Sequence, residues 1–238
     1  MEPKELEKVE DKEVVRKSNG GAAAGFDDVD VNADIKMPRL LILQGLSELV
    51  SQGKGMVGQI ANSVTEEIYG DHIDIIPLFM FKTRARFEVG RGLVMMSRDN
   101  KFVTMAKDEF ADYEGRPVQE APGYAWDGSE PPSFGEIFNY PVLLADSPNA
   151  FPLSLTFMRS AIKVAKELNS KAFFTGEDFF SRVYRLSSRQ ENGKKGAFSM
   201  PVIEIVGRAS DEQYEAGKQS YQTFHKQKED IAVDLEAE

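Results

Sequence analysis

Three cationic side chains, Lys82, Arg84 and Arg86, recur at every second position of the segment IIPLFMFKTRARFEV (75–89). In an extended strand, alternate residues point to one face and lie about 7 Å apart. That spacing is close to the separation of successive phosphates along an extended single strand of nucleic acid. The pattern predicts a strand face that is exposed to solvent and binds phosphates, together with Arg91. The alternative is a solvated strand face without a ligand.

A second basic segment follows later in the chain and is interleaved with aromatic residues. Its predicted phosphate-binding residues are Arg182, Arg185, Lys194 and Lys195. Single-strand grooves combine such cations with aromatic rings on which bases stack. The predicted stacking residues are Tyr184, Trp126 and Tyr124. For each of these aromatic residues the alternative is a structural role against the core.

The residue types exclude several kinds of chemistry. The chain has no cysteine and only two histidines, His72 and His225, so thiolate and histidine-based metal sites are excluded. The GKG at 53–55 lacks the spacing of a phosphate-binding loop. We expect no enzymatic activity, no metal and no cofactor. A metal-dependent nuclease with carboxylate ligands from distant segments stays an alternative.

The net charge of −10 is concentrated at the two ends of the chain. Residues 1–37 hold 6 basic and 10 acidic residues, and residues 209–238 hold 3 and 8, which leaves 20 and 21 for residues 38–208. We predict a disordered acidic arm (1–37), one domain (38–208), a closing helix (209–228) and an acidic tail (229–238). A tail of this kind can occupy a basic groove and then dock replication or transcription proteins once the groove binds DNA.

Hydrophobic patterns predict a mainly β fold of the α+β class. Strands are expected in RLLILQ (39–44), over 75–89 with Phe79, Phe81 and Phe87 in the core, and in YPVLLAD (140–146). A hairpin is expected around Asn192 and Gly193. Helices are expected over 156–169 and from Ser210 to residue 228. No apolar run is long enough to span a membrane and no secretory signal is present, so a cytoplasmic location is expected.

The chain also resembles a family of phage-encoded single-stranded-DNA-binding proteins. The matching residues are Leu40, Leu43, Gln44, Gly58, Asn62, Thr65, Pro152, Leu153, Ser154, Leu155, Ser160, Lys163, Ala165, Lys166, Asn192 and Gly193. The resemblance covers roughly residues 38–208. It implies an OB-like antiparallel β-barrel, sequence-independent binding, and a role in phage replication, recombination or transcription. Many such proteins end on an aromatic residue, whereas this chain ends LEAE.

The leading hypothesis is therefore a non-enzymatic protein that binds single-stranded DNA or RNA, forms a homo-oligomer and works in the host cytoplasm. Two alternatives stay open. The first is a phage structural or assembly protein without a nucleic-acid role. The second is the metal-dependent nuclease.

Overall fold

Strand β8 (Gly135–Leu144) is the centre of the sheet, and its sequence GEIFNYPVLL is apolar and buried over most of its length. A strand in which apolar and polar residues alternate has one face exposed to solvent, whereas a strand that is apolar throughout is covered on both faces. One edge of β8 pairs with β9 (Leu153–Met158). The other edge is shared by β4 (His72–Pro77) and β5 (Phe81–Glu88). A computed structural model of the chain describes residues 37–128, 130–193 and 196–225, and all of them belong to one compact unit.

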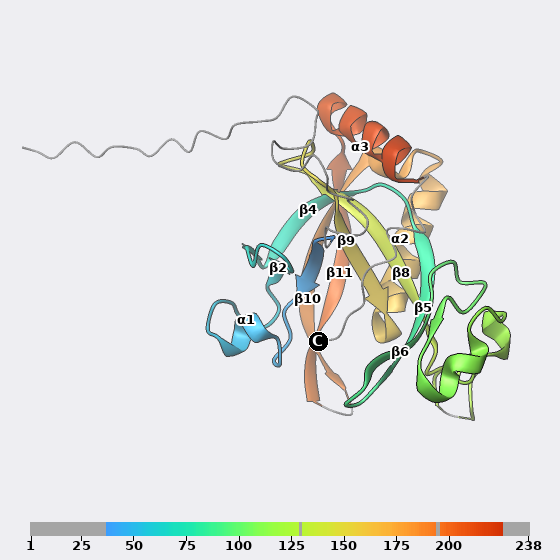
Figure 1. The fold of residues 1–238 in the computed structure, drawn as a ribbon. Helices are drawn as coiled ribbons and strands as arrows, with labels where there is room; N and C mark the ends of the chain where they lie inside the picture. Colours follow the sequence, from blue (N-terminus) through green and yellow to red (C-terminus); the bar gives the residue numbers. More distant parts are fainter. Residues whose placement is uncertain (1–36, 129, 194–195, 226–238) are drawn as a thin grey trace, which may run out of the picture. The chain divides into compact units, whose positions relative to one another are not determined.

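The described residues form one mixed sheet with few helices (Figure 1), which confirms the predicted β-rich α+β class. Its order is β11-β10-β4-β8-β9-β1-β2-β3, and β5, β6 and β7 branch from β8. The other strands are β1 (Arg39–Ile42), β2 (Ile60–Asn62), β3 (Ile68–Gly70), β6 (Gly92–Ser97), β7 (Met105–Ala106), β10 (Arg182–Gly193) and β11 (Gly196–Arg208). The helices are α1 (Glu48–Ser51), α2 (Ile162–Thr175) and α3 (Asp211–Phe224), with 3-10 turns η1 (Asp108–Tyr113), η2 (Val118–Glu120), η3 (Arg159–Ala161) and η4 (Phe179–Ser181).

The sheet is neither wholly antiparallel nor closed by backbone hydrogen bonds within the described ranges. β1 runs parallel to β9, with Leu40 opposite Leu155. Instead, the side chain of Gln44, which follows β1, forms hydrogen bonds with the backbone of β11. Gln44 Nε2 donates to the carbonyl oxygen of Ser199 at 3.0 Å, and the Ser199 N–H donates to Gln44 Oε1 at 2.8 Å. One amide side chain thus makes the pair of bonds that a strand residue would make.

The two long helices cover different apolar clusters of the sheet. α2 places Val164, Ala165 and Leu168 in the cluster that contains Tyr140 and Phe157. α3 packs by Ala216 onto the cluster around Phe79, Phe81 and Phe180. The core assignment of Phe79 and Phe81 is therefore confirmed, while Phe87 is partly buried against a smaller cluster. In Figure 1, α3 lies across one end of the strands.

The segment between β6 and β8 forms a separate lobe, which we define as residues 98–134. β7, η1 and η2 lie in it. Its small core packs Val103, Phe110 and Val118 against Val94 and Phe134. A lobe with its own core is able to hold its loops in fixed positions above β5.

Two predicted elements have different bounds in the structure. The segment 75–89 is two strands, because β4 ends at Pro77 and β5 begins at Phe81. Residues 156–158 of the predicted helix belong to strand β9 (Leu153–Met158), and α2 begins only at Ile162. The helical period fits the spacing of Met158, Ile162 and Leu168. Met158, however, belongs to strand β9, which pairs with β8.

The β10–β11 hairpin and the start of the closing helix are confirmed. The hairpin pairs Gly193 with Gly196. The Gln213 N–H donates to Ser210 Oγ while the Ser210 N–H donates to Gln213 Oε1, which is a complete capping box. Residues 1–36 of the predicted arm (1–37), residues 226–228 of the closing helix and the tail 229–238 lie outside the described residues. Within those residues, no helix is long and apolar enough to cross a membrane.

Candidate nucleic-acid interface

Lys82, Arg84 and Arg86 share one face of β5, as the alternation predicted, but this face is not an open row of cations. Arg84 is only 8% exposed. Lys82 and Arg86 are partly buried. The prediction that all three face solvent is therefore wrong, because the lobe and β8 cover this face and supply partners for each cation.

Arg84 is the most enclosed of the three and links the lobe to the sheet. Its Nε donates to Asn100 Oδ1 at 2.8 Å, and its Nη1 donates to the carbonyl oxygen of Phe134 at 3.0 Å. Its Nη2 lies 3.3 Å from Glu136 Oε1. The guanidinium also stacks on the ring of Tyr124, 4.4 Å from the ring centroid. Tyr124 is thus a half-buried partner of Arg84 and offers this ring face to a protein cation.

The neighbouring cations Lys82 and Arg86 also contact a carboxylate and an aromatic ring each. Lys82 Nζ lies 3.3 Å from Glu136 Oε1 and 4.6 Å from the ring centroid of Phe138. Arg86 lies over the ring of Phe110, and its Nη2 donates to Glu88 Oε1 at 2.9 Å. A phosphate could approach these cations only by competing with carboxylates that already hold them.

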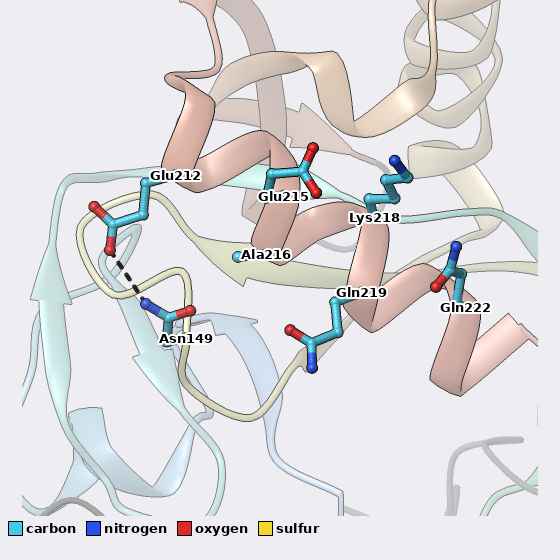
Figure 2. Close-up of a pocket in the computed structure, with 7 residues that line it drawn as sticks. All are labelled: Asn149, Glu212, Glu215, Ala216, Lys218, Gln219 and Gln222. Atoms are coloured by element: carbon cyan, nitrogen blue, oxygen red, sulfur yellow. Dashed lines mark hydrogen bonds between the residues drawn. The ribbon is translucent and has the colours of Figure 1, made fainter. Parts of the chain in front are cut away.

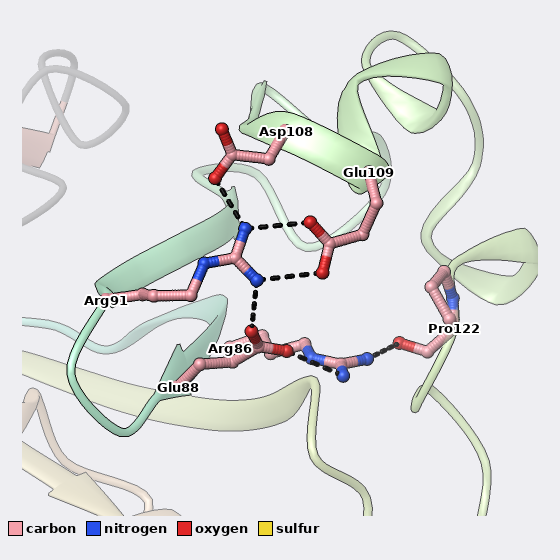
Figure 3. Close-up of polar contacts among 6 residues, drawn as sticks. All are labelled: Arg86, Glu88, Arg91, Asp108, Glu109 and Pro122. Carbon is pink, nitrogen blue, oxygen red and sulfur yellow. Dashed lines mark hydrogen bonds and ion pairs between the residues drawn. The ribbon is translucent and has the colours of Figure 1, made fainter.

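Arg91 is enclosed by three carboxylates (Figure 3). It is 2.7 Å from a Glu88 oxygen, 2.5 Å from an Asp108 oxygen and 2.7 Å from Glu109 Oε2. The hydrogen bonds from Arg91 lower the pKa of Glu109 to about 2. Asp108 has a positive φ of 54°, which is uncommon outside glycine and asparagine. This network fastens η1 to the turn between β5 and β6.

In the second basic segment, the two described cations, Arg182 and Arg185, each pair with a carboxylate. Arg182 pairs with Glu177 at 2.9 Å, and Arg185 makes two hydrogen bonds to Asp74, at 2.7 and 2.9 Å. Tyr184 lies in the core, 1% exposed, and burial raises the pKa of its hydroxyl. A ring that the core covers presents no face to a base. Lys194 and Lys195 lie outside the described residues.

The lobe exposes two aromatic residues and also carries three cations that make no ion pair among the described residues. Trp126 is 68% exposed and Phe102 is 49% exposed. Among the ion pairs of the described residues, none involves Arg98, Lys101 or Arg116. We call Arg98, Lys101, Phe102, Arg116 and Trp126 the lobe patch.

Local hydrogen bonds place the first four residues of the lobe patch together. Phe102 pairs with Pro117 in an isolated β-bridge, and the Val103 N–H donates to the carbonyl oxygen of Arg116 at 2.8 Å. Asp99 Oδ1 accepts hydrogen bonds from the backbone N–H groups of Lys101 and Phe102. Burial alone would raise the pKa of Asp99, but these hydrogen bonds outweigh it and lower the pKa.

Arg84 connects the two loops of the lobe patch, because it binds Asn100 on one loop and Tyr124 on the other. Phe102 follows Asn100 by two residues, and Trp126 follows Tyr124 by two. Sequence reasoning named Trp126 but missed Phe102 and its cations. The available signal was the run SRDNKF (97–102), in which an aromatic residue directly follows a basic one.

Other parts of the surface offer less for nucleic acid. A hollow of about 430 Å³ beside α3 is lined mainly by polar side chains, including Glu212, Glu215 and Gln219 (Figure 2). Its only lining cation is Lys218. Across the described ranges, no group of three His, Asp or Glu side chains could hold a metal ion. That part of the chain therefore gives the nuclease alternative no support.

Comparison with known proteins gives one match. The model of a family described as Pam3 phage gp34-like protein matches residues 5–230. No curated protein and no solved structure matches the chain. The family description identifies a phage protein and states nothing about what it binds.

Proposed function

We propose that this chain, which belongs to the Pam3 phage gp34-like protein family, binds single-stranded nucleic acid through the lobe patch. The observation that carries the proposal is that the lobe exposes Phe102 and Trp126 and also carries three cations that have no carboxylate partner in the described residues. Exposed rings stack on bases whatever the sequence, while cations bind the backbone. The proposed role is protection or organisation of single strands in phage replication, recombination or transcription.

The charge of the lobe determines which kind of binding to expect. Residues 98–134 hold 4 basic and 8 acidic residues. Long-range attraction of a polyanion is therefore weak, and stacking must supply most of the affinity, at about 1–3 kcal/mol for each base. Contacts from three cations give a slope of log affinity against log salt of about −2 for a single strand. We expect modest affinity and a shallow dependence on salt.

The fold supports this proposal in one further respect. Single strands often bind to the loops and face of a small, strongly curved β-barrel. The Gln44 bridge joins the segment that follows β1 to the edge strand β11, so we propose that the sheet is a relative of the OB barrel. Its lobe would then be an added binding element at one rim.

The test compares two variants with the same net charge. Arg98→Ala/Lys101→Ala/Arg116→Ala removes the cations of the lobe patch. The control Arg159→Ala/Lys166→Ala/Lys218→Ala removes three exposed cations outside the lobe. Fluorescence anisotropy with labelled oligo-dT and oligo-rU should show affinity at least 10-fold weaker for the lobe variant at 50 mM salt, and a salt slope near zero. The control should bind as the wild type does.

The stacking residues are tested by the same assay. Phe102→Ala/Trp126→Ala should weaken binding more than the triple cation variant, because stacking dominates. Oligo-dT should also quench the fluorescence of Trp126, which is the only tryptophan of the chain. Absence of binding by the wild type, or equal weakening in the lobe variant and the charge-matched control, would contradict the proposal.

A structural or assembly role is the second candidate, and one observation favours it. The cations of β5 and β10 make their ion pairs within the chain, as in a protein that uses them to hold its own shape. A wild type that binds neither oligonucleotide would leave this candidate as the better one.

A further inference from the structure

The last turn of α2 exposes two large aromatic rings that no described part of the chain covers. Phe173 is 81% exposed and Phe174 is 84% exposed. Their ring centroids lie 5.6 Å apart in an edge-to-face arrangement. Rings of this size each bury about 150–250 Å² when covered. Adjacent exposed rings are typical of an interaction site rather than of a monomer's free surface.

A groove lies next to these rings, between α2 and β11. Lys163 Nζ is 3.4 Å from Glu191, whose strand partner is Phe198. Further along α2, Lys171 Nζ donates to the carbonyl oxygen of Ile203 at 3.3 Å. α2 therefore runs beside β11 in the same direction. The hollow between them measures about 300 Å³, and its apolar lining consists of Val164, Pro201, Val202 and Ile203.

Beyond the groove, β11 continues with two more exposed apolar residues, Ile205 and Val206. The register between β10 and β11 shifts at this point, because Tyr184 is opposite Ile205 and Val183 is opposite Gly207. Val206 is the extra residue of this bulge. Bulges discourage the addition of another strand to a sheet edge. A partner at this surface would therefore contact side chains more than backbone.

We infer that this surface is a dimer interface whose partner is a second copy of the chain. The rings lie in the last turn of α2, and Lys171, about one turn earlier on the same helix, lines the groove. A two-fold axis can therefore place Phe173 and Phe174 of each copy in the groove of the other. The inference is independent of the proposed strand binding, because it uses no residue of the lobe patch.

The charges around the groove are compatible with self-association. Its lining includes two acidic residues, Glu167 and Glu204, and three cations, Lys163, Lys171 and Arg189. A rim of one sign would repel its own copy, whereas a rim of both signs can place opposite charges together. The two rings supply a central apolar contact of roughly 300–500 Å² per copy, and the rim extends it toward the roughly 800 Å² that stable interfaces bury.

The first test is the oligomeric state of the full chain. Sedimentation velocity between about 1 and 100 µM should show a dimer for the wild type. Phe173→Ser/Phe174→Ser should dissociate at least 10-fold more readily. The control Leu46→Ser/Val89→Ser removes two other fully exposed apolar side chains and should leave the dimer unchanged. A monomeric wild type at 100 µM, or a ring variant that dimerises as the wild type does, would overturn the inference.

The second test exploits the reciprocal geometry. Val202→Trp should fill the groove and weaken the dimer while the rings stay exposed, with circular dichroism confirming the fold. An equimolar mixture of the ring variant and Val202→Trp can form one of the two ring-to-groove contacts. Heterodimers should therefore be more abundant than either variant's homodimer. If the mixture associates no better than its components, ring-to-groove packing is wrong.

The two proposals can fail separately. The ring variant should keep the wild-type affinity per chain for a short oligo-dT, since the lobe patch is unchanged. Loss of oligo-dT binding together with the dimer would show that the α2 surface, and not the lobe, contacts nucleic acid.

Discussion

At the level of single residues, the cations of this chain are mostly used within the protein. Arg84 shows how: its guanidinium contacts two loops of the lobe and one strand of the sheet. A guanidinium has five donors in a rigid fork, so it can satisfy acceptors from several segments at once. A residue that looks like a ligand contact in the sequence is in this structure a positioning residue for the loops that carry Phe102 and Trp126.

We predict that Arg84→Met destabilises the protein far more than Lys82→Met does. Loss of Arg84 leaves the buried carbonyl oxygen of Phe134 without its donor and removes the ring contact with Tyr124. Breaking a buried charged contact of this kind costs about 3 kcal/mol. Lys82 is more exposed and its ion pair is worth less than about 1 kcal/mol. Urea unfolding of both variants tests this, and equal losses would mean that Arg84 is not the link between lobe and sheet.

The Arg91 network predicts a response to acid. The folded-state pKa of Glu109 is about 2, below its ordinary value of 4.5. The contribution of this pair to stability is therefore present above pH 4.5 and is lost as the pH falls from 4.5 toward 2. Arg91→Gln removes the pair at every pH. The difference in urea midpoint between wild type and variant should shrink across that window.

Trp126 lies in the lobe, so its fluorescence can be used to follow urea unfolding of the lobe in the wild type and in Arg91→Gln. A difference that stays constant from pH 6 to 2.5 would show that the Arg91 carboxylate pairs contribute nothing to stability.

At the level of elements, Gln44 has a role that its neighbours in the sequence do not suggest. The segment RLLILQ (39–44) was predicted as a strand, but β1 ends at Ile42, and the side chain of Gln44 bridges to β11, 155 residues away. The Ser199 backbone at that site is 4% exposed, so its N–H and C=O need partners. The bridge links the segment that follows β1 to the edge strand β11 without a continuous ladder.

We predict that Gln44→Ala lowers the free energy of unfolding by about 1–3 kcal/mol, because it leaves two buried backbone groups without a partner. The matched control is Gln52→Ala, whose amide bonds only to Glu48 on the surface. The measurement is urea unfolding, and amide hydrogen exchange at Ser199 should speed up in the first variant alone. Slow exchange at Ser199 in Gln44→Ala would show that another group closes the sheet.

The element bounds show where sequence patterns were sufficient. The capping residues of α3 and the hairpin of β10 and β11 depend on local chemistry, and both were predicted correctly. The last three residues of β9, 156–158, were predicted as the start of a helix, because their apolar spacing fits both periods. Pairing with β8 determined the outcome, and that pairing is a long-range contact.

At the level of the whole molecule, the sequence has acidic ends and a near-neutral body. Within the described body, carboxylates on neighbouring strands and turns pair with most of the predicted binding cations. This leaves the lobe patch and the α2 surface as the two regions with the clearest capacity for interaction. One combines exposed rings with cations that make no ion pair among the described residues, and the other combines exposed rings with a groove lined by apolar and charged residues.

The sequence by itself determined the β-rich class, the alternation that places Lys82, Arg84 and Arg86 on one face, and the distribution of charge, because these depend on residue type and on local periodicity. Only the tertiary structure decided whether those cations are free. Glu136 is 54 residues from Lys82, and Asp74 is 111 residues from Arg185. No local pattern places such partners, since strand order and register bring them together.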